Sequence, residues 1–593
     1  MLRCQPACRA GTGDMSSGSI ADGYDVIVIG AGAGGMTAAA VAASRGLDTI
    51  VIEKTGLIGG TTAVSGGMVW APNAASPSSP HAWDSPRRAT AYLDAVIASE
   101  EGRDLREHYL AEAPKAIAYL EQHTHVHLAP VPFYPDYYPD APGATLSGRV
   151  LEPLPFDGRQ LGAWFARLRP PLPAFTLLGG MMVARADIPH FRNVFKSADS
   201  LGRVLRLVAG YCLQRTRFHR GTHLVLGNAL AARLLKSLLE LRTTILLDTS
   251  TLRLVRKDDR VCGVEVQMPS GERRLVEARR GVVLACGGFS HNKELRARLL
   301  PAEAGDCSAA AEGSTGDGLA LAQAVGGVLA EAAVSPAFWT PASLPARGDG
   351  RPGVYPHTVT DRGKPGMLAV SAAGLRFTNE ADSYHEFVKA MLRTHNQQRA
   401  IPAYLICDSL SLWRYGLGAI KPLTLRLAPY RRSGYLVEAL SLRTLAARLG
   451  IDAGNLEATV AIYNRDAAAG IDTRFGRGSN AYHRYVGDAA NLPNPCMRPL
   501  DRPPFYAVAL YPADLGTATG LRTGRNAEVL DREGRPIAGL YACGNDMSSI
   551  MCGAYPGPGI TLGPALVFGY LAATHIAAGR ERDGGPSAIP SAQ

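Results

Sequence analysis

The feature that most constrains the fold is a glycine-rich turn between two short apolar runs near the N-terminus. Residues 24–29 (YDVIVI) and 48–53 (DTIVIE) are rich in β-branched side chains and predict buried parallel strands. The alanine-rich residues 36–45 between them predict a helix. Strand, turn, helix and strand within about 30 residues form one βαβ unit. The chain is therefore expected to contain a parallel sheet with crossover helices.

The turn reads GAGAGG over residues 30–35, a match to GxGxxG. Gly30 permits the tight turn, Gly32 lets the backbone approach a pyrophosphate, and Gly35 allows close packing of helix and strand. Phosphates then face the free N–H groups at the positive end of the helix. Glu53, about 20 residues on, can accept a hydrogen bond from a ribose hydroxyl. This context predicts a dinucleotide site rather than plain glycine packing.

A long loop after the second strand favours FAD over NAD. Residues 54–70 (KTGLIGGTTAVSGGMVW) are rich in glycine and hydroxyl side chains, and such a loop can wrap a pyrophosphate and a flavin ring with backbone N–H groups. Residues 539–546 (GLYACGND) predict a strand that ends in polar side chains and resembles the last strand of FAD enzymes. The residues expected to bind the cofactor are Gly30, Gly32, Gly34, Gly35, Glu53, Lys54, Gly60, Thr61, Thr62, Ser65, Gly66, Gly67, Gly287, Gly544, Asn545, Asp546 and Leu562.

Composition limits the remaining function classes. The chain has 593 residues, enough for two or more domains, and no apolar run of the roughly 18–20 residues that span a bilayer. Its net charge is +10, but Lys and Arg are scattered and no nucleic-acid module occurs, so we expect no nucleic-acid partner. Its ten cysteines form no CxxC pair and no zinc spacing. We expect no metal site, reduced thiols and a cytoplasmic location.

One basic stretch leaves a membrane contact open. Residues 201–220 place leucine, valine and tyrosine among five arginines. The pattern is typical of an amphipathic surface helix, and it also suits a helix that lies on a membrane surface.

Changes in composition along the chain predict its domains. Residues 245–289 predict a β-meander and another buried strand, residues 300–496 favour loops and amphipathic helices, and strand character returns at 504–510. We therefore expect tails at 1–22 and 581–593. A cofactor domain at 23–298 and 497–580 is assembled from both ends of the chain, and a second domain is inserted at 299–496.

Together these motifs resemble the fumarate reductase/succinate dehydrogenase flavoprotein superfamily. The resemblance rests on the glycine turn, GGTT and SGG in the loop, TGDG (315–318), GLRFTNE (374–380) and the C-terminal GLYACGN. It implies an α/β fold: a Rossmann-like FAD-binding domain from both chain ends, an inserted α+β catalytic (capping) domain, and the flavin ring between them. Because residues 54–70 contain no histidine, we expect noncovalent FAD.

Two tyrosines replace arginines of that superfamily. Its dicarboxylate members keep a proton-shuttling arginine five residues after the Asn of RFxNE, and a carboxylate-clamping arginine after the C-terminal GN strand. Tyr384 and Tyr555 stand at those positions here. The exchange removes the cations that pair with dicarboxylates. A tyrosine suits a neutral ketone, because it can donate to the carbonyl or, as phenolate, accept a carbon acid's proton.

Residues 544–570 and 135–143 closely resemble the 3-ketosteroid Δ1-dehydrogenases. The resemblance implies that Tyr384, its pKa lowered by neighbours, abstracts the C2 proton of a steroid while flavin N5 takes hydride from C1. Tyr555 and the N–H of Gly559 would stabilise the C3 enolate, and Tyr137, or its neighbour Tyr138, would support the base. The implied role is steroid degradation, with a steroid substrate and an electron acceptor of unspecified identity as partners.

Other functions stay open on sequence alone. A 3-ketosteroid Δ4-(5α)-dehydrogenase or another cyclic-ketone desaturase would need the same tyrosines. A fumarate reductase-like reductase of an unsaturated acid would need the missing arginines. A flavin- or lipid-binding protein without activity is the alternative from a different class.

Overall fold

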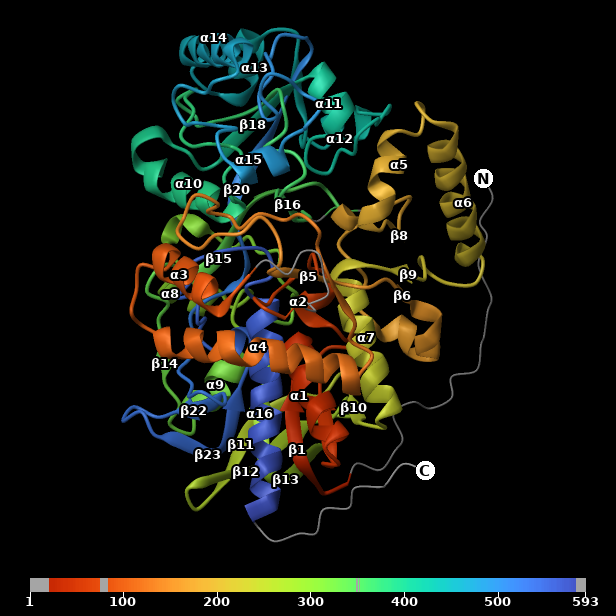
Figure 1. Ribbon diagram of the computed structural model, residues 1–593, viewed down its shortest axis with the longest axis vertical. Helices are drawn as coiled ribbons and strands as arrows, with labels where there is room; N and C mark the ends of the chain where they lie inside the picture. The colour runs from red at the N-terminus through yellow and green to blue at the C-terminus, as the bar shows by residue number, and fades with distance from the viewer. Residues whose placement is uncertain (1–20, 75–83, 348–349, 351, 583–593) are drawn as a thin grey trace.

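A computed structural model describes residues 21–74, 84–347, 350 and 352–582 of the chain (Figure 1). Most of the two expected tails lies outside the described residues. The predicted βαβ unit is present as β1 (Gly23–Ile29), α1 (Ala33–Ser44) and β2 (Thr49–Ile52). β1 and β2 are parallel, with Ile27 opposite Ile50, and α1 begins directly after the glycine turn.

Both ends of the chain build the main sheet, whose strand order is β10-β2-β1-β13-β12-β23-β22. The last four residues of β13 (Arg273–Leu284) pair in parallel with β1, and the same segment pairs in parallel with β23 (Pro536–Ala542) near the C-terminus. β10 (Thr244–Leu246) extends the sheet beyond β2, and β22 (Glu528–Leu530) closes it beyond β23. The expected meander is formed by β11 (Ser250–Lys257), β12 (Arg260–Gln267) and the start of β13.

Helix α16 (Leu562–Arg582) ties the C-terminal segment to the first helix. Its Gly569 allows close approach, because a Cβ there would lie 2.6 Å from the carbonyl oxygen of Gly34. One stretch of α16, Leu562–Gly579, is long and apolar enough to cross a membrane. More than half of that stretch is buried, and α16 packs against α1 and α4 (Arg103–His123) as a core helix.

A second sheet lies at the opposite end of the molecule, with the order β16-β15-β20-β18-β17 and β19 paired to β20 (Figure 1). Its central strand, β20 (Phe505–Thr517), follows residue 496, where the sequence placed the return to the cofactor domain. Strand character in the sequence marked residues 504–510 as a strand but did not identify the sheet that the strand joins. The domain boundaries themselves stay predictions. The other strands of this sheet are β15 (Ala337–Ser343), β16 (Tyr355–Pro356), β17 (Met367–Val370), β18 (Ala403–Asp408) and β19 (Val437–Ala439).

Between the two sheets, residues 158–222 leave the main body of the chain; we call them the excursion. Its base is closed where β6 (Phe156–Asp157) pairs with β9 (His223–Leu224). The excursion carries short 3-10 turns, the small hairpin β7 (Thr176–Leu177) and β8 (Met181–Met182), and the helices α5 (Ile188–Arg192) and α6 (Ala198–Arg215). Figure 1 shows α5 and α6 projecting to one side of the molecule.

The remaining helices and strands complete the fold around the two sheets. They are α2 (Gly60–Ala63), β3 (Val69–Trp70), α3 (Pro86–Val96), β4 (Leu128–Pro130), β5 (Val150–Pro153), α7 (Leu226–Glu240), α8 (Lys293–Leu299), α9 (Asp317–Gln323), β14 (Leu329–Ala330), α10 (Tyr384–Gln398), α11 (Ser409–Tyr415), α12 (Ala428–Arg432), α13 (Leu442–Leu449), α14 (Ala453–Ala469), α15 (Ala481–Val486) and β21 (Gly520–Leu521).

The GLRFTNE motif fixes the start of α10 through a buried ionic network. Glu380 lies 2.6 Å from Arg376 and 3.1 Å from Arg477, and Arg376 also pairs with Asp472 at 2.9 Å. All four side chains are almost completely buried. Because burial of an ion is costly unless it is paired, removal of one partner leaves uncompensated charge. The network therefore holds the turn that leads into Tyr384.

We expect Glu380→Gln to lower the free energy of unfolding by about 3–5 kcal/mol, the usual loss when one partner of a buried ion pair is removed. Urea unfolding of the flavin-loaded protein would measure it. Glu303→Gln, at an exposed glutamate, is the matched control. Equal unfolding midpoints for the two variants would contradict the assignment.

Candidate active site

The glycine turn has the geometry of a phosphate cradle. Gly30 has φ +106°, and a Cβ there would overlap the carbonyl oxygen of Ala285. A Cβ on Gly35 would overlap the carbonyl oxygen of Gly30. A Cβ on Gly32, in contrast, would meet nothing within 4 Å. Gly30 and Gly35 thus allow two backbone segments to approach closely. Gly32 faces open space at the N-terminus of α1, where a phosphate binds best.

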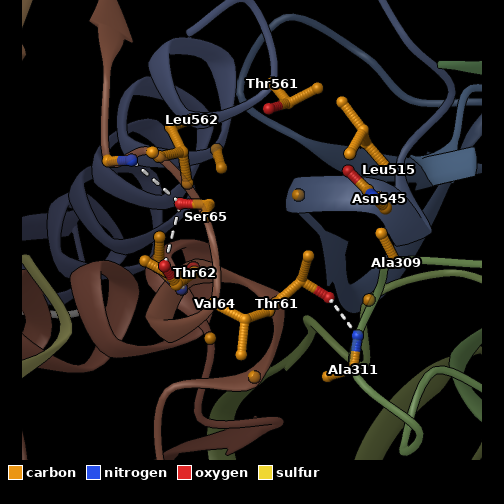
Figure 2. Close-up of a pocket in the computed structure, with 18 of the residues that line it drawn as sticks. Thr61, Thr62, Val64, Ser65, Ala309, Ala311, Leu515, Asn545, Thr561 and Leu562 are labelled. Atoms are coloured by element: carbon orange, nitrogen blue, oxygen red, sulfur yellow. Dashed lines mark hydrogen bonds between the residues drawn. The ribbon is translucent and has the colours of Figure 1, made fainter. Parts of the chain in front are cut away.

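That open space belongs to a cavity of about 440 Å³ that runs from the glycine turn to a group of tyrosines. In Figure 2, Ser65 and Leu562 lie across part of this cavity from Asn545 and Leu515. Gly35 and Asp546 do not line it. The predicted residues that line it are Gly30, Gly32, Gly34, Glu53, Lys54, Gly60, Thr61, Thr62, Ser65, Gly66, Gly67, Gly287, Gly544, Asn545, Leu562, Tyr137, Tyr384, Tyr555 and Gly559.

Two residues that were predicted to bind the cofactor, Glu53 and Lys54, also form contacts within the protein. Glu53 accepts hydrogen bonds from the backbone of Ala31 at 3.0 Å and of Thr55 at 2.9 Å. Its two oxygens offer about four lone-pair sites, so capacity remains for a ribose hydroxyl. Lys54 forms an ion pair with Asp317 of the TGDG motif at 2.7 Å.

The loop after β2 is ordered by its hydroxyl groups. Thr62 Oγ1 accepts from the backbone N–H of Ala33 at 3.0 Å, and Thr61 Oγ1 accepts from that of Ala311 at 3.0 Å. Ser65 Oγ donates to the Thr62 carbonyl and accepts from Gly67 N–H (Figure 2). These hydrogen bonds therefore hold the loop as one wall of the cavity.

Asp546 was expected to bind the cofactor; it does not line the cavity, and its contacts are with the backbone behind it. Its carboxylate is fully buried and accepts from the backbone N–H of Cys286 at 2.6 Å and of Gly288 at 2.9 Å. Burial raises the pKa of this carboxyl group, and the two N–H bonds act against that rise. The Asp546 carboxylate therefore holds the glycine turn after β13 against the turn after β23.

Three tyrosines from distant parts of the chain meet at the other end of the cavity. Tyr384 is the first residue of α10, Tyr137 lies in the loop after β4, and Tyr555 lies in the turn before α16. The hydroxyl groups of Tyr137 and Tyr384 are 3.0 Å apart. The ring of Tyr555 is 5.1 Å from that of Tyr384 and 5.7 Å from that of Tyr137. Tyr138, the other reading of the sequence, donates to Glu386 instead.

Gly559 completes this end of the cavity. It has φ +94°, and a Cβ would lie 2.5 Å from the carbonyl oxygen of Met68, so only glycine fits. Its carbonyl accepts from Trp70 N–H at 3.2 Å. Within the described part of the chain, its own N–H has no acceptor and is free to bind an oxygen in the cavity.

Burial controls the acidity of the tyrosines. It raises the pKa of Tyr384 and of Tyr137 well above the ordinary value, and that of Tyr555 to about 12. The expectation that neighbours lower the pKa of Tyr384 is therefore wrong, because burial outweighs them and its direct neighbours are phenols. The hydrogen bond from Tyr137 is the one nearby contact that favours the Tyr384 phenolate.

Sequence reasoning missed the side walls of the cavity. The excursion contributes two arginines and several apolar residues, and β16 with the turn after it contributes another wall. No motif marked these segments, because apolar residues in loops carry no periodicity. Tyr134 lay in the Pro/Tyr-rich loop but was not singled out. The missed residues are Tyr134, Arg169, Leu172, Phe175, Val183, Arg185, Ile188, Pro356, Thr358, Val359, Thr360 and Tyr485.

Known proteins are similar to this chain in sequence and in fold. Residues 25–562 match the family described as FAD binding domain. The 3-oxosteroid 1-dehydrogenase of Mycobacterium tuberculosis is 37% identical, over 93% of this chain and 98% of that protein. The 4-oxocyclohex-2-ene-1-carboxylate 5-dehydrogenase of Sinomonas cyclohexanicum is 36% identical, over 93% of both chains. A crystal structure of 3-ketosteroid Δ1-dehydrogenase from Sterolibacterium denitrificans, with 1,4-androstadiene-3,17-dione bound, superposes with a TM-score of 0.88 at 36% identity, covering 94% of this chain and 100% of that one.

The open face of Gly32 gives a direct test of the FAD cradle. Gly32→Val should fold normally, since nothing in the protein occupies the space, but should bind FAD at least about tenfold more weakly because its side chain enters the cavity. Flavin fluorescence during titration of the apoprotein measures the dissociation constant. Gly202→Val, at a glycine of α6 that also faces open space, should leave it unchanged. Unaltered FAD binding by Gly32→Val would contradict the cradle.

Proposed function

The chain belongs to the 3-ketosteroid Δ1-dehydrogenase family of FAD-dependent oxidoreductases, and we propose that it catalyses the 1,2-desaturation of a 3-ketosteroid. The observation that carries the proposal is the meeting of Tyr137, Tyr384, Tyr555 and Gly559 at one end of the cofactor cavity. Bound FAD supplies the acceptor for the hydride that leaves C1.

The free N–H of Gly559 and the hydroxyl of Tyr555 line the cavity where the C3 carbonyl would bind. Together they stabilise the charge that develops on this oxygen as the enolate forms, and such donors are worth most where water is excluded. Tyr555 is buried and Gly559 is half-buried. By stabilising the enolate, the pair makes the C2 proton more acidic.

Tyr384 is the proposed base for that proton. Its phenolate is disfavoured by burial, and the hydroxyl of Tyr137 offsets part of this cost by donating to it. The C2–H bond breaks as the proton passes to the Tyr384 oxygen, the hydride leaves C1, and the C1–C2 double bond forms. A neutral site suits a neutral ketone, because a cation at either tyrosine would instead favour a carboxylate.

The other readings differ in substrate or in the bond that is formed. Neither tyrosine position offers the arginine that a reductase of an unsaturated acid needs, so we favour the desaturase. The excursion and the turn after β16 supply an apolar wall for a hydrophobic ring system, from Leu172, Phe175, Val183, Ile188 and Val359. A 3-ketosteroid Δ4-(5α)-dehydrogenase would use the same ketone clamp, and the position of the new double bond in the product distinguishes it.

The base assignment predicts a large loss of rate without loss of cofactor. Tyr384→Phe should retain FAD but slow anaerobic reduction of the flavin by a 3-keto-4-ene steroid by at least about 100-fold, the lower range for removal of a general base. Stopped-flow absorbance of the flavin measures this step. Tyr138→Phe is the matched control, because its hydroxyl contacts Glu386 rather than Tyr384. A near-normal rate in Tyr384→Phe would remove it from the base role.

We further propose that α6 rests on an anionic lipid surface, from which a hydrophobic substrate enters. Leu201, Leu205 and Phe195 are exposed, with Leu205 at 58% and Phe195 at 84%. Arg206 and Arg215 on the same helix are also exposed and complement anionic headgroups. The eight cysteines among the described residues are unpaired, which supports a reducing compartment and hence the cytoplasmic face of a membrane.

Leu205→Asp should therefore reduce co-sedimentation with phosphatidylglycerol vesicles several-fold, since the substitution removes apolar area and adds repulsion. Leu425→Asp, at a leucine that is 85% exposed and lies outside the excursion, should not. If the wild-type protein fails to sediment with these vesicles, or if both variants lose binding alike, α6 is an ordinary surface helix.

A further inference from the structure

One charged side chain lies with the tyrosines rather than with the cofactor turn. The charged residues that line the described cavity are Glu53, Lys54, Arg169, Arg185 and Asp317. Lys54 and Asp317 pair with each other, and Arg169 reaches Thr55 beside Glu53. These four belong to the nucleotide end. Arg185 remains, in a wall whose other side chains are tyrosines and apolar residues.

The surroundings of Arg185 hold its guanidinium in one plane. Its Nε donates to Glu152 at 2.9 Å, and its Nη1 donates to the hydroxyl of Tyr485 at 3.1 Å. The guanidinium carbon lies 5.9 Å from the ring centre of Tyr134. Tyr134 in turn lies next to Tyr137 of the catalytic group. The side chain of Arg185 is thus held by contacts with Glu152, with Tyr485 of α15 and with Tyr134, three residues far apart in the sequence.

One nitrogen of this guanidinium, Nη2, has only a weak partner among the described residues. Nη2 contacts the sulfur of Met68 at 3.8 Å, and sulfur is a weak acceptor. Among the described residues Nη2 has no oxygen acceptor. Glu152 accepts from Nε and Tyr485 accepts one of the two N–H groups of Nη1, so the second N–H of Nη1 and those of Nη2 are left for a ligand. Paired Nη groups match the two oxygens of a carboxylate.

We propose that the preferred substrate is a cyclic 3-ketone that also carries a carboxylate, and that Arg185 binds this carboxylate. The inference rests on the proposed function, in which Tyr555 and Gly559 hold the ketone of the same substrate. An Arg oriented by Glu152 and Tyr485 selects an acid over its ester, since only the acid carries the negative charge that a guanidinium pairs with.

The test compares a 3-keto-4-ene steroid with a side-chain carboxylic acid and the methyl ester of the same compound. For the wild-type holoenzyme we expect kcat/KM to favour the acid by at least tenfold, and this preference to shrink as salt is added. In Arg185→Met the acid-to-ester ratio should fall at least tenfold. Arg203→Met, in the same excursion but paired with Asp187 on the surface side, should keep the wild-type ratio.

The outcomes separate this inference from the proposed function. Turnover of both compounds with equal kcat/KM in the wild type, or a ratio unchanged in Arg185→Met, overturns the carboxylate site and leaves the desaturase intact. Failure of every 3-ketosteroid to reduce the flavin overturns the proposed function itself. Should Arg185→Met lose its flavin or its thermal stability, the wild-type acid preference and its salt dependence still decide the question.

Discussion

The buried carboxylate of Asp546 is the contact on which the cofactor site depends. It comes from the segment after β23, near the end of the chain, and it accepts two backbone N–H groups from the turn after β13. β1, the first strand, pairs with that same β13. The Asp546 side chain therefore joins the segment after β23 to the segment after β13, next to the glycine turn that follows β1. Without it, three separate loops would have to find a common geometry around the ligand.

The local parts of this architecture could be predicted from the sequence. The βαβ unit, the glycine turn and the β-meander depend on residues close in the chain, so periodicity and spacing were enough to predict them. The tyrosines at 384 and 555 could be placed because they stand at positions that a known family reserves for arginine. Their contact, and the choice of Tyr137 over Tyr138, came only with the three-dimensional arrangement.

Other features could not be read in advance, for physical reasons that differ. A carboxylate at the end of a strand looks the same whether it meets a ligand or two backbone N–H groups, so the contacts of Asp546 with Cys286 and Gly288 could not be read from the sequence. The apolar composition of residues 504–510 identified a strand, but a strand pattern does not say which sheet the strand joins. Burial raises the pKa of Tyr384, and burial among other phenols is a property of the packed site alone.

The excursion has a consequence for how such enzymes diversify. Its two ends lie side by side at the β6–β9 pair, yet the segment between them supplies Leu172, Phe175, Val183, Arg185 and Ile188 to one wall of the cavity. The tyrosines proposed for catalysis lie outside it, whereas its Arg169 lies at the nucleotide end of the cavity, next to Thr55. This part of the wall is therefore one continuous stretch of sequence, so that substitutions at its apolar residues change the substrate wall without changing the tyrosines proposed for the oxidation.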